Sequence, residues 1–451
     1  MVNRKMWLRC LLALFTLLLI CTSGCGSGGS GDSGNGTPPP TAPPPPSSKV
    51  YGFGFSPYVN EQDPNKGAVV SAEQIEKRMK IIASYTKWVR TFGCTRGLEH
   101  AGSIAHRLQL KIAMGAWIGK DLAANEAELS SLIRESLSGN VDLAIIGSEV
   151  LLRGDLEPAV LIGYIRRFRM EVPNVPVTIA DVYSELLEKP EVMAECDVIL
   201  VNYYSYWEGV DVSSAMAWLH ARHRRVVAVA AGKEVIVSET GWPSAGSRLD
   251  DAVPSPENAA FYFLNFVSWA LAENVDYFYF SALDEKWKEA YESQQGVGGH
   301  WGVFDEDGNM KPGMQAVFDG ETVEDNWTCG DIPGGTGIPA IELTVVPPVG
   351  SSENLRGQVW HVAPDEAGVA VYIKVNGGWW TKPFWNNPVT PINCDGSWVC
   401  DITTGGSDPE ATDIAAFLIP LTYTPPTAAW DGVLPAELYV NSVAYAEVKR
   451  A

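Results

Sequence analysis

The chain has 451 residues, of which 46% are hydrophobic, so it is long enough for two or three domains with sizeable cores. Lys and Arg number 33 against 54 Asp and Glu, and the net charge of −21 excludes nucleic acid and docking on anionic lipid through a basic patch. A neutral polysaccharide is compatible with this charge, and 16 Trp and 16 Tyr supply rings that either stack on sugars or form cores.

Residues 1–25 have the pattern of an export signal. Arg4 and Lys5 precede an apolar run over 11–20, which is too short to span a bilayer, and small residues precede Cys25. This end resembles a bacterial lipobox, with Thr22 where Leu is usual, so we expect Cys25 to carry a lipid; the alternative is ordinary signal cleavage nearby. The protein is then exported and lipid-anchored at the cell surface or outer membrane, or otherwise secreted.

A linker is expected over residues 26–48, which are almost all Gly, Ser, Pro, Thr and Asn and cannot bury a core. Strands and helices alternate over 49–320, with helices such as 71–84, begun by a capping box at Ser71, and 158–170, begun by Pro158. The rival fold, an open doubly wound sheet, would have a Gly-rich loop and a helix after its first strand. Residues 52–57 lack the third Gly of such a loop, and an irregular stretch follows them. The pattern therefore predicts a (β/α)₈ TIM barrel. Its buried parallel strands are expected over 50–55, 88–93, 111–117, 141–146, 177–179, 198–203, 234–237 and 275–282.

The sequence pattern changes after a second expected linker, residues 321–340. Residues 341–451 contain short runs with period-two alternation, at 369–375, 398–403, 414–419 and 444–448, and no helix longer than two turns. We expect a smaller all-β, sandwich-like accessory domain. Trp379, Trp380 and Trp385 cluster beside turn residues; exposed, they would bind glycan, and buried, they would form the sandwich core.

Five cysteines follow the export signal, and this odd number leaves at least one thiol free. Cys394 and Cys400 are close enough in sequence to staple a hairpin, and Cys94 and Cys196, at strand ends, are expected to be buried thiols. Their spacing does not suit zinc.

Two acidic residues follow directly on predicted strands, Glu149 on the fourth and Glu239 on the seventh. In a TIM barrel such positions lie at the catalytic face, although a single Glu there is equally a structural ion pair. Two carboxyl groups across the barrel mouth are what glycosidic cleavage requires, one as acid and one as nucleophile or base. A gap of about 5 Å would retain configuration and one of about 6.5–9.5 Å would invert it.

The segment 239–244, Glu-Thr-Gly-Trp-Pro-Ser, resembles the nucleophile motif of glycoside hydrolase family seventeen, the β-1,3-glucanases and β-1,3-glucanosyltransferases. The resemblance implies a retaining mechanism with Glu149 as acid/base and Glu239 as nucleophile. Further matches occur in the family's order at 51, 56–58, 89–93, 147–149, 202–209, 254–258, 280–288 and 300–304.

Two departures affect the expected linkage and rate but not the carboxylates. Ser148 stands where the family has an Asn that is expected to bind the sugar 2-hydroxyl, and Tyr204 and Ser205 stand where His and Pro are frequent. Arg90 and Tyr206 are candidates for keeping Glu239 ionised. The full set of expected substrate-binding residues is Tyr58, Arg90, Ser148, Asn202, Tyr206, Trp242, Glu285, Trp287 and Lys288, with a surface ion pair as the alternative for Glu285 and Lys288 and support of the nucleophile loop for Trp242.

The leading hypothesis is a monomeric retaining endohydrolase that cuts β-glucan at β-1,3 linkages and whose chemistry needs no cofactor or metal. A β-1,3-glucanosyltransferase would use the same two Glu residues. A non-catalytic surface protein that binds glycan is the alternative from another class.

Overall fold

The computed structural model describes residues 46–60, 62–292, 295–324, 327–385, 387–427 and 430–450. The expected export signal with Cys25, and the expected linker as far as residue 45, lie outside these ranges. None of the described helices is long and apolar enough to cross a membrane.

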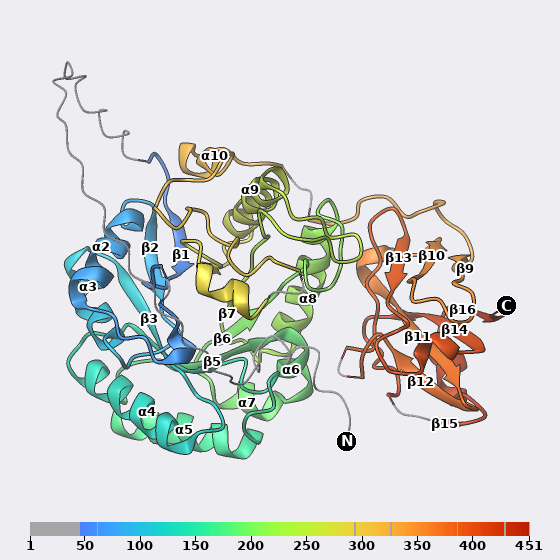
Figure 1. The fold of residues 1–451 in the computed structure, drawn as a ribbon, viewed down its shortest axis with the longest axis horizontal. Coiled ribbons are helices and arrows are strands. Elements are labelled where there is room, and N and C mark those ends of the chain that lie inside the picture. The colour runs from blue at the N-terminus through green and yellow to red at the C-terminus, as the bar shows by residue number, and fades with distance from the viewer. Residues whose placement is uncertain are drawn as a thin grey trace, which may run out of the picture.

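Eight parallel strands form the first domain in the order β7-β6-β5-β4-β3-β2-β1-β8, and a parallel bridge between Val237 and Tyr277 brings the two ends together. Helices surround the strands (Figure 1), so the predicted (β/α)₈ barrel is confirmed. The strands are β1 (Val50–Gly54), β2 (Thr86–Arg90), β3 (Lys111–Ala116), β4 (Leu143–Ser148), β5 (Val177–Val182), β6 (Ile199–Asn202), β7 (Val235–Glu239) and β8 (Phe278–Tyr279). The helices are η1 (Pro64–Lys66), α2 (Ala72–Ile82), η2 (Leu98–His100), α3 (Ala101–Arg107), α4 (Leu122–Leu137), α5 (Pro158–Glu171), α6 (Tyr183–Glu188), α7 (Pro190–Glu195), α8 (Ala215–Val229), α9 (Pro256–Ala272), η3 (Lys286–Ala290) and α10 (Gln315–Asp319).

The helix starts expected from the sequence are present. Ser71 Oγ accepts a hydrogen bond from the Gln74 N–H at 3.2 Å and caps α2. Pro158 occupies the first turn of α5, where its missing N–H leaves no bond unmade. Such local signals set where these helices begin, while the strands and helices of the barrel pack around a core of aliphatic and aromatic side chains.

The C-terminal domain (340–450) contains two antiparallel sheets, in the orders β13-β10-β9 and β15-β12-β11-β14-β16. Leu355, Val371, Trp398 and Leu418 belong to one buried cluster that draws on both sheets, so the predicted sandwich-like domain is confirmed. Its elements are β9 (Ala340–Val345), β10 (Leu355–Trp360), η4 (Pro364–Glu366), β11 (Ala367–Val375), β12 (Gly378–Lys382), β13 (Ser397–Cys400), η5 (Asp408–Glu410), β14 (Asp413–Pro420), β15 (Trp430–Asp431), α11 (Ala436–Asn441) and β16 (Ala444–Lys449).

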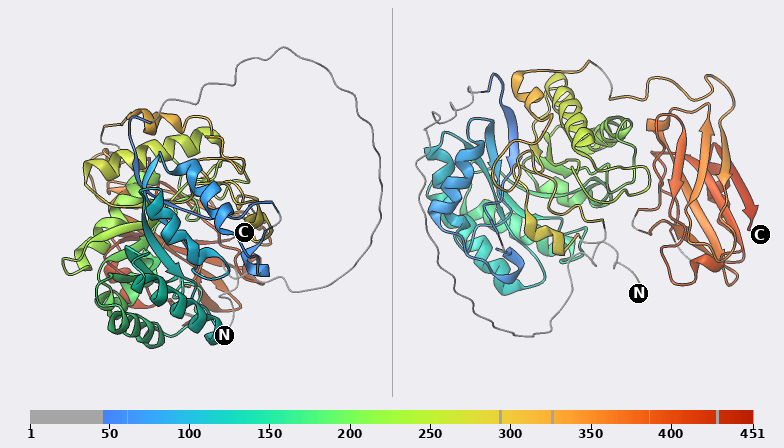
Figure 2. Two further views of the ribbon diagram at one scale, coloured as in Figure 1. Left: turned by 90° about the vertical axis from the view of Figure 1, so that its left-hand side faces the viewer. Right: turned by 45° about the horizontal axis from the view of Figure 1, so that its top comes forward.

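The two domains stand side by side in Figure 1 and in the right-hand view of Figure 2, with η4 packed against α8. The C-terminal domain therefore lies next to the part of the barrel built from β6 and β7, the strand that ends in Glu239.

A disulfide joins Cys329 to Cys394, 65 residues apart. The expected Cys394–Cys400 staple is wrong, because Cys400 is a buried free thiol on β13. Cys94 and Cys196 are buried thiols, as predicted. The bond links the segment that leaves the barrel to a loop of the C-terminal domain, a pairing that proximity in sequence does not suggest.

Replacing Cys329 and Cys394 together by Ser is expected to lower the free energy of unfolding of the C-terminal domain by about 4 kcal/mol, the chain entropy of a loop of this length. Urea unfolding followed by Trp fluorescence measures the change. A reductant should lower the stability of the native chain to that of the variant and leave the variant unchanged. Equal stability without reductant would contradict the prediction.

Candidate active site

Glu149 lies directly after β4, and Glu239 is the last residue of β7. Both therefore lie at the face of the barrel where catalytic residues are expected. The pairing of β4 with β5 shifts register between Ile145 and Ser148, and Glu149 adopts a φ of 54°. A non-glycine residue in this left-handed region is uncommon and stores strain, which is frequent at functional sites. The Glu149 N–H donates to the Ala180 carbonyl at 2.8 Å, so the backbone after β4 is held in this turn.

Hydrogen-bond donors surround both carboxylate oxygens of Glu239, which is 6% exposed. Its Oε1 accepts from Arg90 Nη1 at 2.8 Å and from Ser148 Oγ and Asn202 Nδ2, each at 3.1 Å. Its Oε2 accepts from the Tyr204 hydroxyl at 2.8 Å. An ionised carboxylate only accepts hydrogen bonds, so this set of donors suits the charged form that a nucleophile requires.

Glu149 has the opposite environment. Burial, and after it the negative charge of Glu239, raise the pKa of Glu149 to about 7. A carboxyl group with this pKa still holds its proton in mildly acidic solution and can donate it to a leaving oxygen. The two carboxyl groups therefore differ in the way that acid and nucleophile must differ.

The gap between the carboxyl groups is bounded by one shared donor. Asn202 Nδ2 lies 3.0 Å from Glu149 Oε1 and 3.1 Å from Glu239 Oε1. These two oxygens can therefore be no more than about 6 Å apart, a bound that fits the separation of about 5–5.5 Å between the carboxyl groups of retaining enzymes.

Asp181, on β5, fixes the chain that follows Glu149. Its carboxylate accepts from the N–H groups of Leu151 at 2.8 Å and Leu152 at 3.3 Å. Burial and the nearby charge of Glu149 raise the pKa of Asp181 to about 8. Asp181 is thus a positioning residue that acts through the loop after β4.

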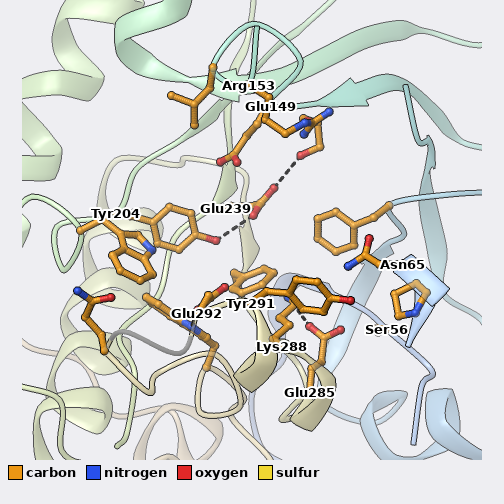
Figure 3. Close-up of a pocket in the computed structure, with 18 of the residues that line it drawn as sticks. Ser56, Asn65, Glu149, Arg153, Tyr204, Glu239, Glu285, Lys288, Tyr291 and Glu292 are labelled. Atoms are coloured by element: carbon orange, nitrogen blue, oxygen red, sulfur yellow. Dashed lines mark hydrogen bonds and ion pairs between the residues drawn. The ribbon is translucent and has the colours of Figure 1, made fainter. Parts of the chain in front are cut away.

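A cavity of about 1070 Å³ opens over this pair. Figure 3 shows Glu239 at its centre, Glu149 and Arg153 on one wall, and Glu285 and Lys288 on the wall opposite. Seven residues predicted for the site line it: Tyr58, Ser148, Glu149, Glu239, Glu285, Trp287 and Lys288. Arg90 and Asn202 are buried behind the wall and contact the carboxylates from there.

Two further predicted residues neither line the cavity nor contact the two carboxyl groups in the described structure. The Tyr206 ring is fully buried and its hydroxyl donates to the Ser247 carbonyl at 2.7 Å, so the expectation that it contacts Glu239 is wrong. Trp242 is 1% exposed and donates from Nε1 to the Val253 carbonyl at 3.0 Å, which is the loop-supporting role given as its alternative.

Tyr204 takes the place expected for Tyr206. It lies two residues after Asn202, and the chain turns after it: the Gly209 N–H bonds to the Tyr206 carbonyl at 3.0 Å. The alternation of β6, continued from Asn202, indicates that Tyr204 shares its face. That signal was present in the sequence, where Tyr204 was noted only as a departure from the family.

The η3 helix supplies a buried ion pair to the cavity wall. Lys288 Nζ lies 2.6 Å from Glu285 Oε2, with side-chain exposures of 14% and 4%. Trp287 Nε1 donates to Glu285 Oε1 at 3.2 Å, and its ring meets that of Tyr58 edge to face. The alternative of a surface ion pair is therefore wrong. This wall presents rings and charged groups together, the composition that binds sugar faces and hydroxyls.

The wall contains further residues outside the set of substrate-binding residues predicted from the sequence. Trp301 Nε1 donates to Glu292 Oε2 at 3.0 Å, and burial raises the pKa of Glu292. Trp207 and Arg153 also line the cavity. In the described ranges, no three His, Cys, Asp or Glu side chains are placed to hold a metal ion.

Of the three Trp residues proposed for glycan binding in the C-terminal domain, one is buried and two are exposed. Trp379 is 8% exposed and packs in a core cluster of that domain, so it offers no face to a glycan. Trp380 and Trp385 are 38% and 50% exposed, with ring centroids 6.2 Å apart and planes inclined by 22°. This stacked pair stays a glycan-binding prediction.

Comparison with known proteins shows the family of the barrel domain. Residues 52–302 match the family model of the BtgE/BtgC glycoside hydrolase domain. The chain is 28% identical over 274 residues to glucan endo-1,3-beta-glucosidase btgC of Emericella nidulans, covering 54% of this chain and 42% of that protein. It is 26% identical over 277 residues to glucan 1,3-beta-glucosidase of Saccharomyces cerevisiae, covering 56% of this chain and 88% of that protein.

Among solved structures, the chain is similar to a glycoside hydrolase family 17 beta-1,3-glucanosyltransferase from Rhizomucor miehei. The identity is 34% and the TM-score 0.52, and the match covers 59% of this chain and 96% of that one. An active-site mutant of the same enzyme, in complex with laminaritriose, matches with 33% identity and the same TM-score of 0.52.

Proposed function

Through residues 52–302 the chain belongs to the BtgE/BtgC glycoside hydrolase family, and from that membership we propose that it cleaves β-1,3-linked glucan with retention of configuration. The observation that carries the stereochemical part is the short gap between Glu149 and Glu239, bounded by their shared contact with Asn202. The linkage is supported by the names of the similar glucosidases and of the glucanosyltransferase.

In the first step, Glu239 attacks the anomeric carbon while Glu149 passes its proton to the glycosidic oxygen, and the bond to the leaving sugar breaks. The negative charge of Glu239 disappears when its oxygen becomes the ester of the glycosyl-enzyme. That charge is one cause of the raised pKa of Glu149, so the pKa of Glu149 falls at this stage. Glu149, now ionised, takes a proton from the water that releases the sugar, and both carboxyl groups return to their first states.

The test is to follow laminari-oligosaccharide cleavage by NMR at early times. Retention predicts that the new reducing end appears first as the β-anomer and then mutarotates. Appearance of the α-anomer first would overturn the mechanism. Cleavage of β-1,4-linked glucan in preference to β-1,3 would overturn the linkage.

A β-1,3-glucanosyltransferase is the second candidate, favoured by the 34% identity to the Rhizomucor miehei enzyme. A sugar hydroxyl would then replace water as the acceptor of the glycosyl group. Products longer than the starting oligosaccharide identify the transferase, and only shorter ones identify the hydrolase. A protein that binds glucan without releasing or transferring sugar would support the third alternative, a non-catalytic surface protein.

Tyr204 is expected to assist the nucleophile, because its hydroxyl donates to Glu239 Oε2 in a partly buried site. Tyr204→Phe should lower kcat/KM by roughly 10- to 100-fold, the value of a hydrogen bond to a charged group. Tyr206→Phe removes a neighbouring hydroxyl that bonds the Ser247 carbonyl and not Glu239, and it should lower the Tm with little change in kcat/KM. Steady-state kinetics of the two variants compare them, and equal losses would contradict a specific role for Tyr204.

For its localisation we propose export and anchoring by a lipid on Cys25, with the protein acting as a monomer on glucan at a cell surface or outer membrane. The support is the sequence alone: a charged start, a short apolar run and small residues before Cys25. Cys25→Ala should move the protein from the detergent phase to the aqueous phase on detergent partitioning. An unchanged partition would favour ordinary cleavage.

A further inference from the structure

The catalytic cavity has walls from both domains. On the barrel side, beyond Glu149 and Glu239, it is lined by Glu208, which lies in the segment after β6. Facing this segment, the same cavity is lined by Phe384 and Asn387 of the C-terminal domain, which follow β12. The C-terminal domain is thus part of the boundary of the cavity that holds the two carboxyl groups.

A hydrogen bond joins the two walls at this point. Asn387 Nδ2 donates to Glu208 Oε2 at 2.8 Å. Burial raises the pKa of Glu208, and the amide of Asn387 opposes that rise. The contact therefore ties a polar group of each domain together at the edge of the cavity.

Further contacts hold the domains in this arrangement. The Asn393 side chain accepts from the Asp211 N–H at 3.1 Å and donates to Asp251 Oδ2 at 3.0 Å. The Cys394 N–H donates to Ser214 Oγ at 2.9 Å, beside the disulfide to Cys329. A domain attached through side chains, backbone and a disulfide keeps its cavity-lining loop in place, unlike a module on a free tether.

The lining groups have the chemistry of a sugar subsite. A half-buried Phe ring offers a face to the C–H side of a pyranose, and neighbouring amide and carboxylate groups bond hydroxyls. We propose that Phe384, Asn387 and Glu208 form a subsite for a distal glucosyl unit of the same glucan chain that is cut between Glu149 and Glu239. This inference rests on the proposed function and adds to it that the C-terminal domain sets the length of chain the enzyme prefers.

The test compares short and long substrates in Phe384→Ala. With laminariheptaose, kcat/KM should fall about three- to tenfold, the loss of one aromatic contact, whereas with laminaritriose it should stay as in the native chain. Phe384→Leu keeps an apolar side chain without a ring face and should give the same length-dependent loss. Tyr445→Ala, which removes a 54% exposed ring on β16 outside the cavity, is the matched control and should change neither value.

Equal losses on both substrates, or no loss on either, would overturn the subsite. Binding of the same two oligosaccharides to Glu239→Gln, with and without Phe384→Ala, repeats the comparison without turnover. If the protein binds laminariheptaose through Phe384 but releases no sugar, the proposed hydrolysis is contradicted and the subsite is supported. If the protein cleaves both substrates equally well with and without the Phe384 ring, the subsite is contradicted and the hydrolysis is supported.

Discussion

Glu239→Ala is expected to lower kcat on laminari-oligosaccharides by on the order of 10⁵-fold, because the proposed mechanism requires its carboxylate to form the glycosyl-enzyme. The structure supports this size of effect: Glu239 ends β7 at the centre of the cavity, and Ala has no oxygen to accept from the donors that contact both Glu239 oxygens. Folding of the variant should be checked by its melting temperature, since removing Glu239 leaves Arg90 buried without its partner.

The readout that separates a nucleophile from a structural carboxylate is rescue by azide. In Glu239→Ala, azide can occupy the space of the carboxylate and attack from the same face, so an activated aryl β-glucoside should yield the α-glycosyl azide. In Glu149→Ala, the covalent intermediate still forms and azide replaces water, so the β-glycosyl azide is expected. The two variants are controls for each other. If Glu239→Ala gave the β-glycosyl azide and Glu149→Ala the α-glycosyl azide, the roles assigned to the two residues would have to be exchanged.

Glu149→Gln is expected to lower kcat by roughly 10²- to 10⁴-fold on oligosaccharides, whose leaving oxygen needs a proton. An aryl glycoside with an acidic phenol leaves without that proton, so its glycosylation step should be nearly unaffected. Burst kinetics on such a substrate separate the two steps. A loss of the same size in the burst rate would show that Glu149 is not the acid.

The pH profile should reflect the same group. Burial and the charge of Glu239 raise the pKa of Glu149 to about 7, so the proton is present below pH 7 and is lost as the pH rises through that value. Activity on oligosaccharides should therefore fall on the alkaline side with a midpoint near pH 7, and Glu149→Gln should lose this limb. A profile that is flat to pH 9 in the native chain would contradict the assignment.

The barrel and its two carboxylates were predictable because both depend on local pattern. Buried parallel strands are short apolar runs, and in this chain β4 and β7 lead directly into Glu149 and Glu239. Register within a strand also fixes faces, so Asn202 at the end of β6 could be expected to point with Tyr204. The choice of Tyr206 was wrong because the turn that begins at Ser205 ends the extended chain that carries the alternation past β6.

Hydrophobic periodicity in the sequence was enough to predict the fold class of each domain, because it is a property of neighbouring residues. Acidic residues at strand ends, together with the family resemblance, indicated Glu149 and Glu239 as the candidate catalytic pair. Only the tertiary structure decided which groups surround that pair, that Cys329 pairs with Cys394, and that Phe384 lines the same cavity as Glu239. These contacts join residues tens to hundreds of positions apart, and their geometry depends on how two domains pack. Packing is a sum over many weak contacts, so no short stretch of sequence carries it.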